Sequence, residues 1–273
     1  MNLSRIAALA AASVAALSVP ASANHSWGGY HWATNGNGLT VKVNTSISSQ
    51  WTSPVNGAIA DWEKSTVLSL GTRNPVPADP KKCGAIAGQI LVCNASYGQR
   101  QWLGIANIWL SNGHISQATT RLNDSYFNMA QYNTPAWRNF VACQEIGHDF
   151  GLDHQDENFN NANLGTCMDY TNNPSTNQHP NTHDYDMLKS IYGHSDGFTS
   201  ATSATNFGIR QVGKAPAARP SSDAVGDTAA AWGRAIHTDG LGRPDVFVKD
   251  LGRGEKVLTH VLWTLETKRS DIE

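Results

Sequence analysis

The sequence predicts an α+β fold, in which strands form a sheet and helices pack against it. Short segments with alternating apolar and polar residues indicate strands, and longer segments with apolar residues three and four positions apart indicate helices. The composition favours a domain with many ordered loops over a helical bundle, because Gly occurs 24 times and Trp 9 times. The chain has 273 residues, enough for one medium domain with an appendage or for two small domains.

Most of the strand signals lie in the first half of the chain. Four segments are expected to be strands: 39–43, 89–94, 102–110 and 114–122. A turn at Ser111-Asn112-Gly113 separates the last two of them. Between the first two, residues 54–68 are expected to form a helix with Ser53 as its N-cap and Pro54 at its first position.

Residues 1–23 are typical of a secretory signal peptide. Arg5 precedes the apolar run 6–19, and Ala21-Ser22-Ala23 provides the small residues needed for cleavage after Ala23. The alternative is a membrane anchor, but the run is shorter than the ~20 residues that span a bilayer. The sequence therefore predicts a secreted, extracellular protein.

The charge of the chain limits its partners. A net charge of −2 with 15% charged residues provides no basic surface for nucleic acid. After the signal peptide, no segment is long and apolar enough to cross a membrane. We expect neither nucleic acid nor a membrane as a partner, and we expect a monomer.

The stretch 143–157 has the spacing of a metal site. On a helix, residues four apart lie on one face, so Gln144 and His148 point the same way and Glu145 lies beside them. Gly151 can take the positive backbone angle that ends a helix, which would turn the chain and bring His154 back towards His148.

This stretch resembles the zinc-binding motif of the metzincin metallopeptidases, H-E-x-x-H-x-x-G-x-x-H. It matches that motif at Glu145, His148, Gly151 and His154, and it has Gln144 in place of the first histidine. Downstream, the segment 166–170 reads Thr-Cys-Met-Asp-Tyr and resembles the Met-containing turn, here called the Met turn, that metzincins carry beneath the metal. Its M-x-Y form is similar to the astacin and serralysin branches, and the family also includes the matrixins.

The resemblance covers roughly residues 39–193 and implies a metzincin-like catalytic domain over 24–196. Such a domain has a twisted mixed sheet packed on helices, an active-site helix at about 135–150 and a closing helix, here opened by Asn181 as its N-cap. By analogy with the family, residues 102–109 are the candidate edge strand that binds an extended peptide or protein substrate; the alternative is an interior strand.

The resemblance also implies the chemistry of peptide hydrolysis. One catalytic zinc ion would be held by His148 and His154, and Glu145 would be the general base that takes a proton from water. Tyr170 would stabilise the oxyanion, or else be a packed tyrosine. Met168 would form an apolar floor beneath the metal.

Gln144 occupies the position of the missing ligand. Its amide oxygen is a weaker donor to zinc than imidazole, so we expect reduced zinc affinity. We favour direct coordination by Gln144, because a chain that had abandoned metal would not need Glu145. The alternatives are a water held by Gln144, or Tyr170 as an oxygen ligand.

Two functions are therefore considered. The first is a secreted zinc-dependent metalloendopeptidase. The second is a catalytically impaired metzincin-like protein that binds peptides or another protein. Glu145 favours the first, because a peptide binder has no use for a general base.

The four cysteines favour two disulfides over free thiols in an exported protein, and three pairings are open. We expect Cys83 to pair with Cys93, closing a short loop, and Cys143 to pair with Cys167, tying the motif helix to the Met turn. The alternative for Cys143 is a buried free thiol. A zinc role is less favoured, because no C-x-x-C pair exists.

Other polar residues are weaker metal candidates. The oxygen-rich cluster Asp153, Asp156, Glu157 and Asn158 could bind Ca²⁺, although a solvated turn is the favoured interpretation. His179 and His183 are expected to be surface or capping residues.

The C-terminal third changes in character. Residues 197–227 are rich in Ser, Ala, Thr and Pro and are expected to be a linker. Residues 228–273 are expected to form a small β appendage. Three segments within it have strand patterns: 234–237, 245–250 and 257–263.

Overall fold

The computed structural model describes residues 25–36, 38–71, 74–201 and 225–272. The expected signal peptide, 1–23, lies outside the described residues, as does most of the expected linker, at 202–224.

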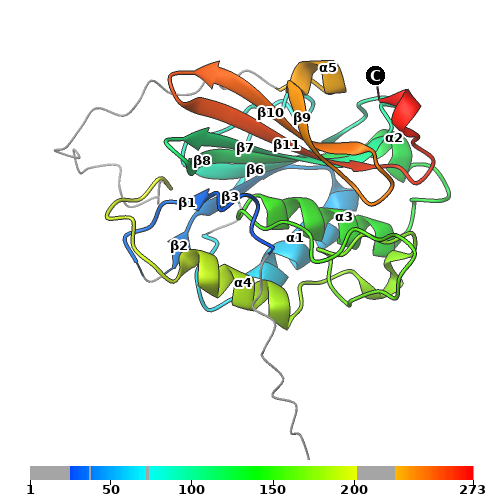
Figure 1. Ribbon diagram of the computed structural model, residues 1–273. Helices are drawn as coiled ribbons and strands as arrows, with labels where there is room; N and C mark the ends of the chain where they lie inside the picture. The colour runs from blue at the N-terminus through cyan, green and yellow to red at the C-terminus, as the bar shows by residue number, and fades with distance from the viewer. Residues whose placement is uncertain (1–24, 37, 72–73, 202–224, 273) are drawn as a thin grey trace, which may run out of the picture.

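The architecture is α+β, as predicted, with one large mixed sheet. Figure 1 shows the three long helices below this sheet and a short helix, α5, above it. The α-helices are α1 (Ser49–Trp62), α2 (Asp124–Phe127), α3 (Pro135–His148), α4 (Thr182–Tyr192) and α5 (Ala229–Trp232). Single 3-10 turns lie at Pro174–Thr176 and Arg269–Asp271.

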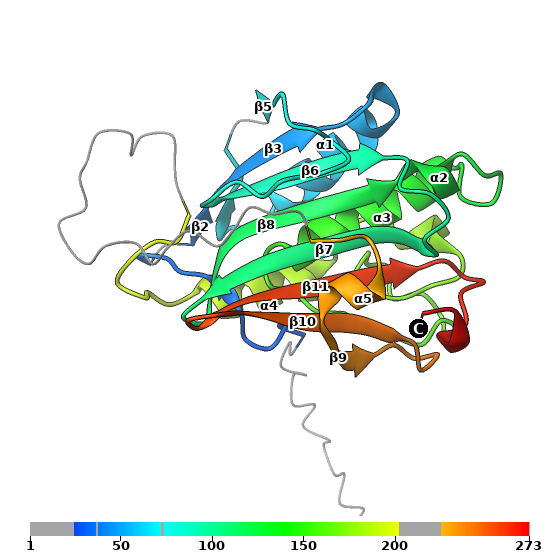
Figure 2. The same cartoon turned by 90° about the horizontal axis from the view of Figure 1, so that it is seen from above.

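The large sheet has nine strands, eight of which form the order β5-β3-β6-β8-β7-β11-β10-β9 seen from above in Figure 2. The ninth, β1, pairs in parallel with β8, while β2 and β4 pair separately. The strands are β1 (His31–Trp32), β2 (Leu39–Thr40), β3 (Lys42–Ser46), β4 (Leu68–Ser69), β5 (Asn74–Pro75), β6 (Gln89–Ala95), β7 (Trp102–Ser111), β8 (His114–Asn123), β9 (Arg234–Thr238), β10 (Pro244–Gly252) and β11 (Glu255–Trp263). Pairing is parallel from β5 through β8 and antiparallel from β8 through β9.

The first helix starts and ends earlier than the expected 54–68, and its last residue is Trp62. Helix α1 begins at Ser49 with Ser48 as its N-cap, so the expected N-cap at Ser53 is wrong and Pro54 lies inside the helix. Trp51 and Val55 are four apart and fully buried, and packing of this extra turn outweighs the single backbone hydrogen bond that Pro54 cannot make.

The C-terminal strands belong to the main sheet and are no separate appendage. Strand β11 runs antiparallel to β7 over nine paired positions, including Ile105 opposite Val261 and Trp109 opposite Val257. Strand β7 is therefore flanked by β8 and β11, and the expected edge strand at 102–109 is an interior strand.

Two hydrophobic cores explain this pairing. The larger core lies between the sheet and helices α1, α3 and α4. The smaller core covers the opposite face of the sheet, where Trp102, Ile105 and Trp109 of β7 pack with Trp232 of α5 and Phe247 of β10. Because β7 carries large apolar side chains towards both faces, the C-terminal strands and α5 are needed to bury the outer one.

The two expected disulfides are both present. Cys83 is bonded to Cys93, and Cys143 is bonded to Cys167. The second bond fastens α3 to the segment that contains Met168, as predicted.

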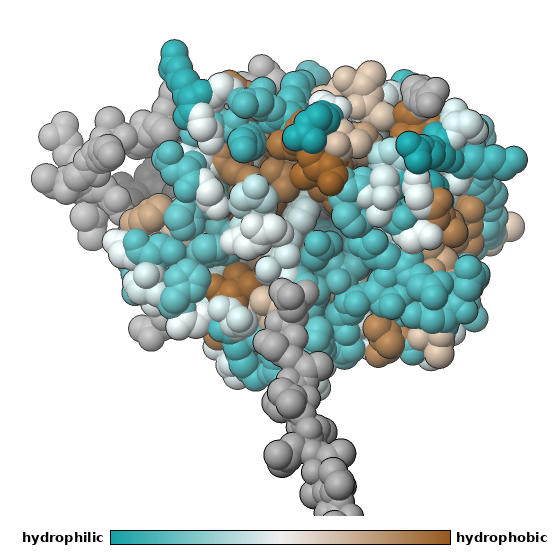
Figure 3. Space-filling model, viewed as in Figure 1, coloured by the Kyte–Doolittle hydropathy of each residue, from teal (hydrophilic) through white to brown (hydrophobic). Residues whose placement is uncertain are grey.

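The surface is mainly hydrophilic on the face seen in Figure 3, where hydrophobic side chains form separate patches. Scattered exposed apolar residues are usual on soluble domains. Among the described residues, no helix has the length and apolar character required to span a bilayer.

Candidate metal centre

Helix α3 and the tight turn after it bring the motif residues together. Thr134 caps the helix by accepting the N–H of Trp137. Past the helix end, Gly151 has φ +87°, and a Cβ there would lie 2.1 Å from the carbonyl oxygen of Tyr30. Only glycine suits this position, and the turn that it permits returns His154 to His148, as the sequence predicted.

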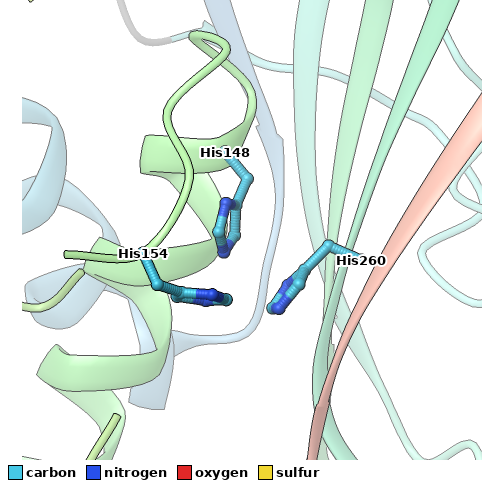
Figure 4. A group of neighbouring side chains, drawn as sticks. All are labelled: His148, His154 and His260. Atoms are coloured by element: carbon cyan, nitrogen blue, oxygen red, sulfur yellow. The ribbon is translucent and has the colours of Figure 1, made fainter. Parts of the chain in front are cut away.

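Three buried histidines converge at this point, as Figure 4 shows. One nitrogen from each of His148, His154 and His260 lies within 4.8 Å of the other two, so this group could bind a metal ion. His148 and His154 come from α3 and the chain after it, whereas His260 comes from β11. Sequence analysis did not identify His260, because a histidine on an apolar strand carries no motif.

Besides Asp149 Oδ1, four buried polar atoms from the motif have no hydrogen-bond partner among the described residues. They are Gln144 Oε1, Glu145 Oε1, His148 Nε2 and His154 Nε2. Buried polar groups without partners are rare, and unpartnered lone pairs of this kind suit a cation. The histidine group therefore fits a metal ion.

His148 Nε2 presents a free lone pair. Its Nδ1 lies 2.8 Å from the carbonyl oxygen of Leu152, which requires the proton on Nδ1 and leaves Nε2 unprotonated in the neutral ring. Burial, followed by the nearby His260 and His154, holds the pKa of His148 well below its usual value. His148 is therefore a neutral imidazole, the form that binds metal.

Gln144 is held in one orientation. Its Nε2 donates to the carbonyl oxygen of Cys167 at 3.1 Å, which leaves the amide oxygen as the unpartnered atom. Met168, which follows Cys167 in the chain, is fully buried. A Cβ added to Gly147 of α3 would lie 2.7 Å from the sulfur of Met168. The Met turn thus packs directly beneath the motif helix.

A chain of contacts joins the motif to the C-terminal strands. His260 Nδ1 lies 3.2 Å from Glu145 Oε2, and His260 Nε2 lies 3.0 Å from the hydroxyl of Tyr170. Tyr170 in turn donates to Asp245 of β10 at 3.1 Å. Burial opposes charge on His260, but the carboxylates of Glu145, Asp245 and Asp153 together outweigh that effect and raise the pKa of His260. Burial, followed by Asp245, raises the pKa of Tyr170 well above its usual value.

The centre is closed to solvent in this conformation. Glu145 is 0% exposed, His148 and His260 are each 1% exposed, and His154 is 8% exposed. Strand β11, which carries His260, lies along β7.

Of the remaining candidates, Asp153 Oδ1 and Glu157 Oε1 lie 3.6 and 3.4 Å from His154 Nδ1, and these three residues could hold a cation. The others lie elsewhere. Asp156 accepts hydrogen bonds from Asn158 and Asn161, as in a self-contained turn. His179 bonds Asp61 at 2.6 Å, and the ring of His183 stacks on His25.

Comparisons with known proteins include a distant structural likeness. No family model matches the chain, and no curated protein matches it. Among solved structures, it is similar to myroilysin, a metallopeptidase, with a TM-score of 0.36 and 12% identity. The match covers 63% of this chain and 100% of that one.

Proposed function

We propose that the chain is a secreted zinc-dependent metalloendopeptidase, described here in a closed form in which its own C-terminal strand covers the active site. The observation that carries the proposal is the set of four unpartnered buried atoms from Gln144, Glu145, His148 and His154. A packed core has no use for such a set, whereas a metal ion and a water molecule would satisfy all four atoms.

The proposed ligands are His148 Nε2, His154 Nε2 and Gln144 Oε1. The bond from Gln144 Nε2 to Cys167 supports this choice, because it fixes which end of the amide is free. His260 is the competing third ligand. Both of its nitrogens are already engaged, one by Glu145 and one by Tyr170, so it would have to give up a contact and a proton to bind metal.

Glu145 is the proposed general base. When bound, zinc would lower the pKa of a coordinated water to about 7 and polarise the peptide carbonyl. Glu145 would accept the proton on its carboxylate and pass it to the leaving amine. Gly104 of β7 provides the space for this side chain, because a Cβ there would lie 2.6 Å from Glu145 Cγ.

His260 and β11 are proposed to keep the enzyme closed. The ring of His260 contacts the carboxylate of Glu145, and β11 fills the strand position beside β7. Peptide hydrolysis then requires β11 to move away from β7, after which Tyr170 would be free to donate to a developing oxyanion.

The complete burial of Glu145 favours a second candidate, a metal-binding protein of the same shape without peptidase activity. In that case the C-terminal strands would be a permanent part of the fold, consistent with the core that they form with β7. Such a protein would hold zinc but would show no hydrolysis in any variant.

Casein hydrolysis by the secreted protein separates the two candidates. The wild type and His260→Ala would be assayed with and without a chelator, beside Glu145→Gln and a control at an exposed carboxylate, Asp186→Asn. We expect chelator-sensitive hydrolysis that is absent in Glu145→Gln and unchanged in the control. If neither the wild type nor His260→Ala gives chelator-sensitive hydrolysis, the second candidate is supported.

A further inference from the structure

A second cluster of histidines lies on the opposite side of strand β1 from the motif, at the junction of three segments. We propose that His31, His114, His194 and Asp196 bind a second zinc ion. His31 lies on β1, His114 begins β8, and His194 and Asp196 follow α4. The side chains of His31, His114 and Asp196 are 16%, 22% and 11% exposed, and that of His194 is 49% exposed.

The distances between these side chains suit a metal ion, and one ligand atom each of His31, His114 and Asp196 lies within 4.8 Å of the other two. The Nε2 atoms of the three histidines lie 3.4, 3.3 and 3.2 Å from Asp196 Oδ1, for His31, His114 and His194 respectively. The Nε2 atoms of His31 and His194 are 3.1 Å apart. Zinc bonds of about 2.0–2.1 Å place neighbouring ligand atoms about 3.3 Å apart. Charge-assisted hydrogen bonds are shorter, at about 2.7–2.9 Å.

The orientation of His31 also suits a cation. His31 Nδ1 donates to the carbonyl oxygen of Gly29 at 2.9 Å, and its Nε2 faces Asp196 Oδ1. Two acceptors that face each other repel unless a proton or a metal ion lies between them. A second histidine, His194, directs its Nε2 at the same two atoms, and one metal ion would satisfy all three.

The carboxylate of Asp196 is already oriented for this role. Its Oδ2 accepts the backbone N–H of Thr34 at 2.8 Å, and its own N–H donates to the carbonyl oxygen of Thr34 at 2.7 Å. These bonds fix Oδ1 towards the histidines. Partners of this kind orient metal ligands and contribute to metal affinity.

The proposed ion would fasten the N-terminal segment to the domain. That segment also flanks the first centre, because the ring of Trp27 lies 5.5 Å from the ring of His148 and Trp32 Nε1 donates to Asp149. A closed set of four protein ligands is typical of a structural zinc site. We therefore expect the ion to stabilise the fold and to take no part in chemistry.

Zinc content of the purified secreted protein, measured by elemental mass spectrometry after dialysis, tests the proposal. We expect two zinc ions per chain in the wild type and one in His31→Gln/His114→Gln. The double variant His148→Gln/His154→Gln should also contain one. The control His179→Gln/His183→Gln removes two histidines that belong to neither cluster and should keep two.

Thermal unfolding gives a second readout. In metal-stripped His148→Gln/His154→Gln, added Zn²⁺ should raise the Tm by several degrees, and adding Asp196→Asn should abolish the rise. Equal zinc content in the wild type and His31→Gln/His114→Gln, or no rise in Tm, would overturn the proposal. A single ion in the wild type that disappears in His31→Gln/His114→Gln would support the second site and count against zinc at the first.

Discussion

His260 Nδ1 lies 3.2 Å from Glu145 Oε2, although the two residues are 115 positions apart in the chain. Both side chains are fully buried. The contact joins the last strand of the sheet to the motif helix at the residue proposed as general base. It ties the proposed chemistry to the position of β11, because His260 engages one oxygen of the carboxylate that is proposed to accept a proton from water.

Replacing His260 by alanine should release Glu145. We expect His260→Ala to hydrolyse casein faster than the wild type while its zinc affinity changes by less than about tenfold, or ~1.4 kcal/mol. His179→Ala, at an exposed histidine paired with Asp61, is the control. A larger loss of zinc affinity without a gain in activity would identify His260 as a ligand and contradict the proposed closed form.

Two substitutions of Gln144 should change zinc affinity in opposite directions. Gln144→His supplies a stronger donor and should retain zinc more tightly than the wild type in a chelator competition. Gln144→Ala should weaken binding by at least the ~10-fold that loss of an outer partner of a metal ligand costs. Equal retention in all three proteins would argue against ligation by Gln144.

The space beside Glu145 depends on Gly104. In Gly104→Ala the new Cβ would lie 2.6 Å from Glu145 Cγ and 2.8 Å from Val141 Cγ1, so the carboxylate must shift. We expect a loss of about 1–3 kcal/mol of stability and reduced hydrolysis with zinc retained. Gly57→Ala in α1, where nothing lies within 4 Å of the added Cβ, is the matched control and should be neutral or slightly stabilising. Unchanged hydrolysis in Gly104→Ala would contradict the proposed position of Glu145.

His237 should make stability depend on pH. Its hydrogen bond to Asp245, at 2.8 Å, raises the pKa of His237 from 6.5 to about 9 despite partial burial. Because the folded-state pKa is the higher one, the stabilisation is complete below about pH 6.5 and is lost as the pH rises through 9. The His237 side chain is 43% exposed, so solvent screening reduces this stabilisation of the fold to about 1 kcal/mol.

Urea unfolding of the wild type and His237→Gln measures this effect. The two proteins should differ by about 1 kcal/mol at pH 6 and should be equal at pH 10. A difference of the same size at both pH values would show that His237 acts by packing and not by charge.

Local sequence patterns predicted the individual elements well. The bounds of β6, β7, β8, α3 and α4 lie within two residues of expectation, because alternation, caps and turn residues act over short distances. Both disulfides were also predicted. The predicted start of α1 is wrong because burial of the face that begins at Trp51 outweighs the preference of Pro54 for the first turn of a helix.

The neighbours of the strands could not be predicted in the same way. Residues 257–263 have a clear strand pattern, but nothing in that pattern says that they pair with β7, about 150 positions earlier. His260 therefore stayed hidden, and so did the cluster around Asp196, whose members come from three distant segments. The motif from Gln144 to His154 was predictable because one helix and one turn hold all of its members.

The most direct test of the proposed centre is a crystal structure of the zinc-loaded protein with anomalous scattering measured at the zinc edge. We predict an anomalous peak in contact with His148 Nε2, His154 Nε2 and Gln144 Oε1, with Glu145 beside it. No peak at that position, or a peak from which the Gln144 amide is turned away, would contradict the proposed ligand set.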